Sequence, residues 1–380
     1  MNLDETDEER MVAESVRRVL EHREDDTEKE TWGRDWDRDS YRHLGELGIL
    51  ELLAVSKDSD DGGATAAVAA GVAAELGRQG VVSPAMSSVG WVASLLSQLD
   101  PAHPALPGLL SGSVVGVFAP IENGSAGAGL FAPTVVAGCA GSTLEVRGRK
   151  AFVPFIADAD FVVVTARKDG ELALVAAPAA SLRESARAMS VTTGDLLSVI
   201  ELDLLLDDAA LIATGATAVA ALERVWARVL LLQAAYLHGG AARLIELTTC
   251  HVTMREQFGQ PVGSFQAVQH HIADADVAVR SARLLVAEQA WREDNVDPHL
   301  LARAAETKAW IAERTAEVAR RAHELQGGIS VVDNHETARL FMRNLSVGVE
   351  DGAPPELWQR AAALRDVPPT IEYARRERER

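Results

Sequence analysis

A short polar and aromatic segment between two long helical patterns carries residue types suited to binding a ligand. It reads Arg255-Glu-Gln-Phe-Gly259, and Gln260-Pro-Val-Gly-Ser-Phe-Gln266 follows directly. The guanidinium of Arg255 offers a fixed fork of donors that matches a pyrophosphate, and an aromatic ring such as Phe258 can lie against adenine. Gly259 allows the chain to leave a helix in a left-handed conformation. A helix end followed by a Pro-Gly loop contains the same residue types, so a purely structural segment is the alternative.

Two adjacent carboxylates lie near the C-terminus. Glu350 and Asp351 are part of Val349-Glu-Asp-Gly-Ala-Pro354, directly before a predicted helix. A charged loop before a helix that starts with proline has these residues, so the pattern by itself assigns them no chemistry.

The elements that position these residues fall into three segments. Residues 1–112 are predicted to form an N-terminal helical domain, because apolar residues recur there at helical spacing. Thr6 and Glu9 fit a capping box at its first helix. Further helices are expected over 41–47, 64–76 and 84–99.

The middle segment, residues 113–208, changes to short β-branched runs separated by glycine, which is typical of strands and turns. We predict a small antiparallel β domain with strands over 114–118, 134–136, 144–146, 161–165, 172–175 and 199–205. Residues 209–380 are predicted as a C-terminal helical bundle. Its helices are expected over 217–255, 265–292, 299–325, 336–347 and 355–365. The predicted fold class is therefore mainly α with a central β domain.

Composition argues against several classes of function. The net charge of −19 disfavours nucleic acid or an anionic membrane surface as the main partner. No apolar run has the length of a membrane span, and the acidic N-terminal residues do not resemble a signal peptide. Cys139 and Cys250 are far apart, so we expect no disulfide framework and a reducing, cytoplasmic location. His270 and His271 lack the spacing of metal ligands, and no metal site is predicted.

The chain resembles the acyl-CoA dehydrogenase family over essentially its whole length. The pattern Arg-x-x-Phe-Gly-x-x-Val-x-x-Phe-Gln in 255–266 is similar to the flavin-contacting segment of that family. The order helical, β, helical also matches the family architecture, which ends in a four-helix bundle. The resemblance implies FAD as the cofactor, bound by Arg255, Gln257, Phe258 and Gln266. In relatives this segment reaches the adenine end of a flavin in the neighbouring subunit, which implies an oligomer such as a tetramer.

Two segments of the β domain resemble flavin-contacting stretches but depart from them. Residues 147–154 look like the stretch that lies against the flavin ring, which implies that Phe152 faces the flavin. An ordinary core aromatic is the alternative for Phe152. Pro154 replaces a common threonine of the family and removes a hydroxyl donor. In 118–127 only Glu122 and Gly124 match, with Ser125 nearby.

The segment His323-Glu-Leu-Gln-Gly-Gly-Ile-Ser330 resembles a further flavin-binding landmark through Gly327 and Gly328. The glutamine of the family falls on Glu324, and its last glycine falls on Ser330. A carboxylate close to a pyrophosphate is electrostatically unfavourable, so we expect Glu324 to turn outward if the site is kept.

The family removes the α-proton of an acyl-CoA with a glutamate that comes from one of two places, while the β-hydride passes to the flavin. The first place corresponds to Val229, which has no carboxylate. The second, counted without gaps from Gly327, falls on Asp351, with Glu350 as the shifted alternative. Aspartate is one methylene shorter than glutamate, and a misplacement of about 1 Å can cost about 100-fold in rate.

These departures cluster at the flavin and the base, as in the base-deficient subunit of heteromeric actinobacterial relatives. We therefore predict α,β-dehydrogenation of an acyl-CoA thioester in fatty acid β-oxidation or related lipid metabolism. The chain is expected to act in a homo- or hetero-oligomer with a second acyl-CoA dehydrogenase subunit. An electron-transfer flavoprotein or a similar acceptor is implied. A flavin-dependent monooxygenase on the same fold and a non-catalytic structural subunit are the alternatives.

Overall fold

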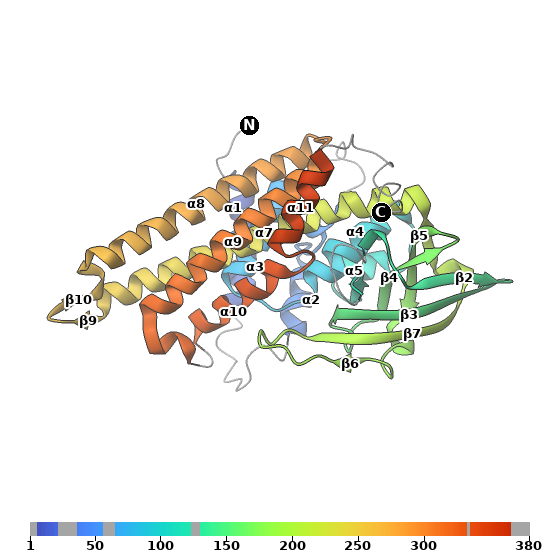
Figure 1. Cartoon of the computed structure of the whole chain (residues 1–380), viewed down its shortest axis with the longest axis horizontal. Helices are drawn as coiled ribbons and strands as arrows, with labels where there is room; N and C mark the ends of the chain where they lie inside the picture. Colours follow the sequence, from blue (N-terminus) through green and yellow to red (C-terminus); the bar gives the residue numbers. More distant parts are fainter. Residues whose placement is uncertain (1–5, 22–35, 56–64, 123–129, 333–334, 366–380) are drawn as a thin grey trace.

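The computed structural model describes residues 6–21, 36–55, 65–122, 130–332 and 335–365. A β domain lies at one end of the molecule, and long helices extend away from it to the other end (Figure 1). No helix in the described ranges is long and apolar enough to span a membrane. The architecture is the predicted one, mainly helical with a central β domain.

The N-terminal segment is helical, as expected from its apolar periodicity. Thr6 and Glu9 form the predicted capping box, since the Glu9 side chain accepts from the Thr6 N–H and the Thr6 hydroxyl accepts from the Glu9 N–H, at 2.9 and 3.2 Å. The helices are α1 (Asp7–Glu21), α2 (Arg38–Glu46), α3 (Ala66–Arg78), α4 (Ser94–Leu99) and α5 (Leu106–Leu110).

The segment 84–99 is helical as expected, but the first half of the helix is not an α-helix. Met86–Ala93 is a π-helix, and it continues directly into α4. Ser87 and Ser88 face the first strand, where their hydroxyls accept hydrogen bonds from the N–H groups of Phe118 and Gly116 at 3.0 and 3.1 Å. These bonds satisfy backbone donors that would otherwise be buried without a partner, and π-helical turns are frequent at functional sites.

The β domain is one mixed sheet in the order β6-β7-β3-β2-β4-β5-β8, with β1 paired to β4. Most pairings are antiparallel, as predicted, but β1 and β2 each pair with β4 in parallel. The short strands β6 and β8 were not anticipated. The strands are β1 (Gly116–Ala119), β2 (Val136–Ala140), β3 (Thr143–Pro154), β4 (Phe161–Lys168), β5 (Glu171–Pro178), β6 (Arg187–Ala188), β7 (Leu197–Asp207) and β8 (Leu211–Thr214).

The C-terminal helices begin and end within three residues of the predicted ranges. They are α7 (Gly215–Met254), α8 (Gln266–Asp294), α9 (Leu300–Gln326), α10 (Glu336–Val349) and α11 (Pro354–Arg365). A small hairpin, β9 (Glu256–Gln257) and β10 (Gln260–Pro261), joins α7 to α8. One hydrophobic core contains residues of both the N-terminal and the C-terminal helices, and a second core lies in the sheet.

Helices α3 and α7 cross in close contact because glycine occupies both sides of the crossing. A Cβ atom added at Gly77 would lie 1.9 Å from the carbonyl oxygen of Tyr236, and one added at Gly239 would lie 1.8 Å from that of Ala74. Real Cβ atoms do not approach so closely, so the two backbones could not pack here with larger residues. This crossing fixes the position of Tyr236, a residue of the candidate site.

We predict that Gly77→Ala lowers the free energy of unfolding by about 1–3 kcal/mol, because the new methyl group forces the helices apart. Gly71→Ala on the same helix is the matched control, since a Cβ there meets nothing within 4 Å. The control should be neutral or stabilising by up to about 1 kcal/mol through helix propensity. Chemical denaturation followed by circular dichroism checks both, and equal effects of the two substitutions would contradict the packing argument.

Candidate active site

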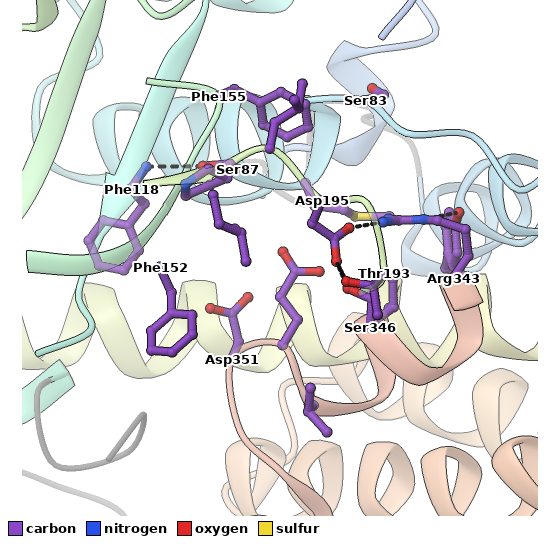
Figure 2. Close-up of a pocket in the computed structure, with 18 of the residues that line it drawn as sticks. Ser83, Ser87, Phe118, Phe152, Phe155, Thr193, Asp195, Arg343, Ser346 and Asp351 are labelled. Carbon is purple, nitrogen blue, oxygen red and sulfur yellow. Dashed lines mark hydrogen bonds and ion pairs between the residues drawn. The ribbon is translucent and has the colours of Figure 1, made fainter. Parts of the chain in front are cut away.

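A cavity of about 600 Å³ lies between the π-helix, the β domain and the end of α10. Its wall is largely apolar, with a few polar groups that converge on it, which is the usual composition of a small-molecule site. Aromatic side chains from several elements line it, among them Trp91, Phe118 and Phe152. Figure 2 shows the labelled residues around this space.

Phe152 is turned into the cavity by an irregularity in β3. The register of the β3–β7 pairing shifts between Lys150 and Val153, and Phe152 takes a left-handed φ of 53°. Its side chain is 46% exposed, so it is not an ordinary core aromatic. Pro154, also predicted to contact a flavin, lines the same cavity.

Glu122 lies at the cavity wall but is engaged in the fold of the β domain. Its carboxylate accepts hydrogen bonds from the Thr134 N–H and from the fully buried ammonium of Lys150, at 2.7 and 2.6 Å. Burial opposes ionisation of this group, but Lys150 and Thr134 outweigh it and lower the pKa of Glu122. Glu122 is therefore bound as an ion-pair partner within the β domain. Gly124 and Ser125 lie outside the described residues.

Asp351, the predicted base, lines the cavity and is held in place by two donors. Its Oδ2 accepts from the indole N–H of Trp91 at 3.0 Å and from the side-chain amide of Gln233 at 2.7 Å. Burial raises the pKa of Asp351, and these two N–H groups oppose that rise because they stabilise the ionised form. Figure 2 shows Asp351 and Phe152 facing the same space.

Glu350, the shifted alternative, also lines the cavity, and within the described ranges no hydrogen bond reaches its carboxylate. Burial is the main reason that the pKa of Glu350 rises to about 7, and the negative charges of Asp351 and Asp195 add to it. The neighbouring carboxylates therefore differ in environment, since Asp351 is bound by N–H donors and Glu350 is not. Val229, the other family position for a base, is fully buried.

The polar end of the cavity is formed by an ion pair between the β domain and α10. The guanidinium of Arg343 donates to the Asp195 carboxylate, which also accepts from the hydroxyls of Thr193 and Ser346 (Figure 2). The Nε of Arg343 donates to the hydroxyl of Tyr236 at 3.3 Å. Burial opposes the charge of Arg343, but Tyr236 and Asp195 prevail and raise its pKa. These contacts tie the loop before β7 to α10.

The predicted flavin-binding segment 255–266 is far from this cavity. Arg255, Gln257, Phe258 and Gln266 are exposed, and none of them lines the cavity. Tyr236 and Arg255 are separated by about 28 Å along α7, at a rise of about 1.5 Å per residue. The hairpin that carries them lies at the end of the molecule opposite the β domain (Figure 1).

The hairpin itself has an unusual backbone. Phe258 and Gly259 are the two central residues of its turn, and both have positive φ, 56° and 82°, which is the type I′ geometry. Gly259 is therefore left-handed as expected, but in a hairpin turn and not at the helix end, because α7 already ends at Met254. Phe258 is 91% exposed at this tip.

Gly327 and Gly328 end α9 as a separate exposed step and do not line the cavity. Glu324 faces outward and is paired with Arg320 and Arg321. Its carboxylate is therefore partly neutralised, which reduces the repulsion expected between it and a pyrophosphate. Gln326 is buried, where it donates to the Thr248 hydroxyl at 2.9 Å and accepts from that of Thr337 at 2.8 Å. It links α9 to α7 and α10.

The cavity residues fit the flavin that the sequence resemblance implies. A flat, aromatic ring system suits a wall of this kind, where Phe152 is held outward by a strained backbone and Phe118 and Trp91 stack at 4.4 Å between ring centroids. The two carboxylates of the loop that follows α10 line the same space. The arrangement places an aromatic surface and two carboxylates in one cavity.

Four residues that hold Asp351 and its loop were not predicted from the sequence, namely Trp91, Trp226, Gln233 and Lys308. Trp91 and Gln233 bind the Asp351 side chain, and Trp226 and Lys308 bind the backbone of the same loop. For Gln233 and Lys308 the sequence signal was a polar or charged residue within an apolar helical pattern, which is costly to bury unless it has a partner.

Comparison with known proteins agrees with the predicted family and fold. The acyl-CoA dehydrogenase C-terminal domain matches residues 217–354. The acyl-CoA dehydrogenase FadE27 of Mycobacterium tuberculosis is 30% identical over 320 residues, which cover 81% of this chain and 82% of that protein.

Two solved structures share the fold over nearly the whole chain. The ChsE4–ChsE5 complex of M. tuberculosis superimposes with a TM-score of 0.80 at 24% identity, covering 97% of this chain and 100% of that chain. A glutaryl-CoA dehydrogenase of Mycobacterium smegmatis in complex with FADH2 gives 0.83 at 20% identity, covering 96% of each. With the cavity and the relative FadE27, these findings confirm the predicted family. The chain belongs to the acyl-CoA dehydrogenases, a family of FAD-dependent oxidoreductases.

Proposed function

We propose that this chain catalyses the α,β-dehydrogenation of an acyl-CoA thioester as one subunit of a heteromeric assembly. The observation that carries the proposal is the pair of carboxylates, Glu350 and Asp351, in the same cavity as the outward-facing Phe152. A carboxylate of this chain would take the α-proton, and FAD, when bound, would supply the acceptor for the β-hydride, so that a carbon–carbon double bond forms. The protein must therefore hold a carboxylate next to the α-carbon and keep water away from it.

Glu350 is the better suited of the two carboxylates to take the proton. A base needs a free lone pair and a pKa near the working pH, and Glu350 has a pKa of about 7 and no donor on its carboxylate among the described residues. Asp351 is bound by Trp91 and Gln233. In this proposal Asp351 is a fixed negative charge that helps to raise the pKa of Glu350, and the chain supplies a base of its own.

The heteromeric assembly is supported by the exposed hairpin. Arg255, Gln257, Phe258 and Gln266 lie too far from the cavity of their own chain to contact a ligand there. The ring of Phe258 meets that of Phe265 edge-on at 6.2 Å between centroids, yet Phe258 stays 91% exposed. A fold neighbour is a complex of two differently named subunits, ChsE4 and ChsE5. The hairpin and the Gly327–Gly328 step would reach the adenine end of the flavin in a second acyl-CoA dehydrogenase subunit. An electron-transfer flavoprotein or similar acceptor would reoxidise the cofactor.

The first test replaces each carboxylate by its amide in the flavin-bound assembly. Glu350→Gln should lower the rate of flavin reduction by an acyl-CoA about 10²- to 10⁴-fold, the usual contribution of a general base. Asp351→Asn should cause a smaller fall. Anaerobic stopped-flow absorbance at the flavin band, across a panel of acyl-CoA esters, measures both. The reverse order of effects would assign the base to Asp351. Turnover that neither substitution affects would mean that the partner subunit supplies the base.

The pH dependence of flavin reduction follows from the pKa of Glu350. A base acts in its deprotonated form, so the rate should be low at acid pH, rise through about pH 7 and then level off. Stopped-flow reduction between pH 5.5 and 9 at saturating substrate gives this profile. A rate that already reaches its plateau near pH 5 would show that a carboxylate of ordinary pKa is the base.

The assembly is tested at the hairpin. Arg255→Ala should weaken flavin binding by about 10- to 100-fold, because a charge-assisted hydrogen bond contributes about 1.5–3 kcal/mol. Arg280→Ala is the matched control, since Arg280 is an exposed arginine on α8 that pairs only with Asp276 among the described residues. The ratio of flavin to protein absorbance and a flavin titration measure both. An unchanged flavin affinity in Arg255→Ala would remove the hairpin from the site.

A further inference from the structure

Lys308 on α9 is one of the largest fully buried side chains of the described protein, with no solvent exposure. Lysine is almost never buried completely without a partner, because the ammonium loses its hydration. The surrounding residues of α9 are small and apolar, among them Ala304, Ala305 and Ala309. A methionine or leucine would fill this space without the desolvation cost of an ammonium, so the charge of Lys308 is expected to have a role beyond packing.

The ammonium of Lys308 binds the backbone of the loop that carries the two carboxylates. It donates to the carbonyl oxygen of Glu350 and to that of Gly352, the latter at 3.1 Å. The carbonyl between them, that of Asp351, accepts from the indole N–H of Trp226 at 3.2 Å. Three consecutive carbonyls are thus bound by side chains from α9 and α7.

This loop needs such support because its backbone is strained. Asp351 has a φ of 54° and Gly352 a φ of 137°, and a non-glycine residue in the left-handed region costs of the order of 1 kcal/mol or more. The left-handed turn at Asp351 lies between α10 and α11 and lets Glu350 and Asp351, although adjacent in sequence, both line the cavity. Without the donors the chain would relax toward an ordinary conformation, and the carboxylates would move.

We propose that Lys308 is a positioning residue for the base, which holds the 350–352 loop in its left-handed turn and places a positive charge beneath the carboxylates. This inference rests on the proposed function and assigns to it a residue outside the cavity. The charged groups that act on Lys308 are Asp351, Glu350 and Glu356. Glu350 is in turn influenced by Arg343 and Asp195. Removal of Lys308 therefore both frees the loop and takes away a charge that favours ionised carboxylates.

The test uses Lys308→Met in the flavin-bound assembly, because methionine keeps the approximate length and removes the charge and the donors. The rate of flavin reduction should fall about 100-fold, as for a misplacement of about 1 Å. The KM for acyl-CoA and the flavin content should stay within about threefold, since Lys308 touches neither ligand in this proposal. The acid limb of the pH profile should move upward, because a lost cation makes the carboxylates harder to ionise. A merely structural lysine would alter folding and flavin content without moving this limb.

Two further variants separate position from charge and from general damage to the helix. Trp226→Phe removes one carbonyl hydrogen bond and no charge, so it should lower the rate less and leave the pH profile in place. Thr315→Val is the matched control on α9, where a buried hydroxyl bonds only within its own helix among the described residues. It should leave the rate and the pH profile unchanged. Wild-type rates in both Lys308→Met and Trp226→Phe would overturn the proposal.

Hydrogen exchange tests the loop independently of catalysis. The N–H groups of Glu350 and Gly352 bond to Ser346 and Val349 at 3.2 and 3.4 Å, and their exchange should accelerate in Lys308→Met and in Trp226→Phe but not in Thr315→Val. Unchanged exchange over 349–353 overturns the proposal even if no acyl-CoA reduces the wild-type flavin. That failure of turnover would count against the proposed function alone. If Lys308→Met does not fold, Trp226→Phe still decides, by its rate and by its exchange.

Discussion

The close crossing of α3 and α7 is the constraint on which the rest of this structure depends. Glycine on both sides lets the two backbones touch, and this contact fixes α7 in the middle of the shared helical core. From there α7 presents Trp226, Gln233 and Tyr236 to the 350–352 loop and to the arginine of α10. The α10–α11 loop is then bound from below by Lys308 of α9. The cavity is therefore a product of helix packing, and its polar groups occupy positions that the packing determines.

The long helices and most strands could be predicted from the sequence, because the spacing of apolar residues differs between helices and strands. The ranges of the long C-terminal helices and the capping box at Thr6 and Glu9 depend on local rules, and local rules can be read along the chain. The strands β6 and β8 have only two and four residues, so they exist through pairing with neighbours and not through their own preference. The π-helix at Met86–Ala93 was not predicted for a similar reason, since its serine hydroxyls accept hydrogen bonds from the backbone of β1.

The site was predictable only in part. Counting along the family pattern led to the loop after α10, and both Glu350 and Asp351 line the cavity. The count does not predict the left-handed turn at Asp351 or the four side chains that donate to Asp351 and its loop, which are Trp91, Trp226, Gln233 and Lys308. These come from parts of the chain that are distant in sequence, so no spacing rule connects them. Gly259 illustrates the same limit, because its positive φ was expected but its place in a hairpin turn depends on where α7 ends.

The length of α7 has a mechanical consequence. One helix carries Tyr236, at the cavity, and leads directly to Arg255, at the exposed hairpin about 28 Å away along its axis. A stiff rod of this kind works as a lever with its fulcrum at the glycine crossing. A tilt of about one degree around Tyr236 displaces the hairpin by about 0.5 Å over that length. A tilt of α7 at the cavity would therefore also move the hairpin at the opposite end of the molecule.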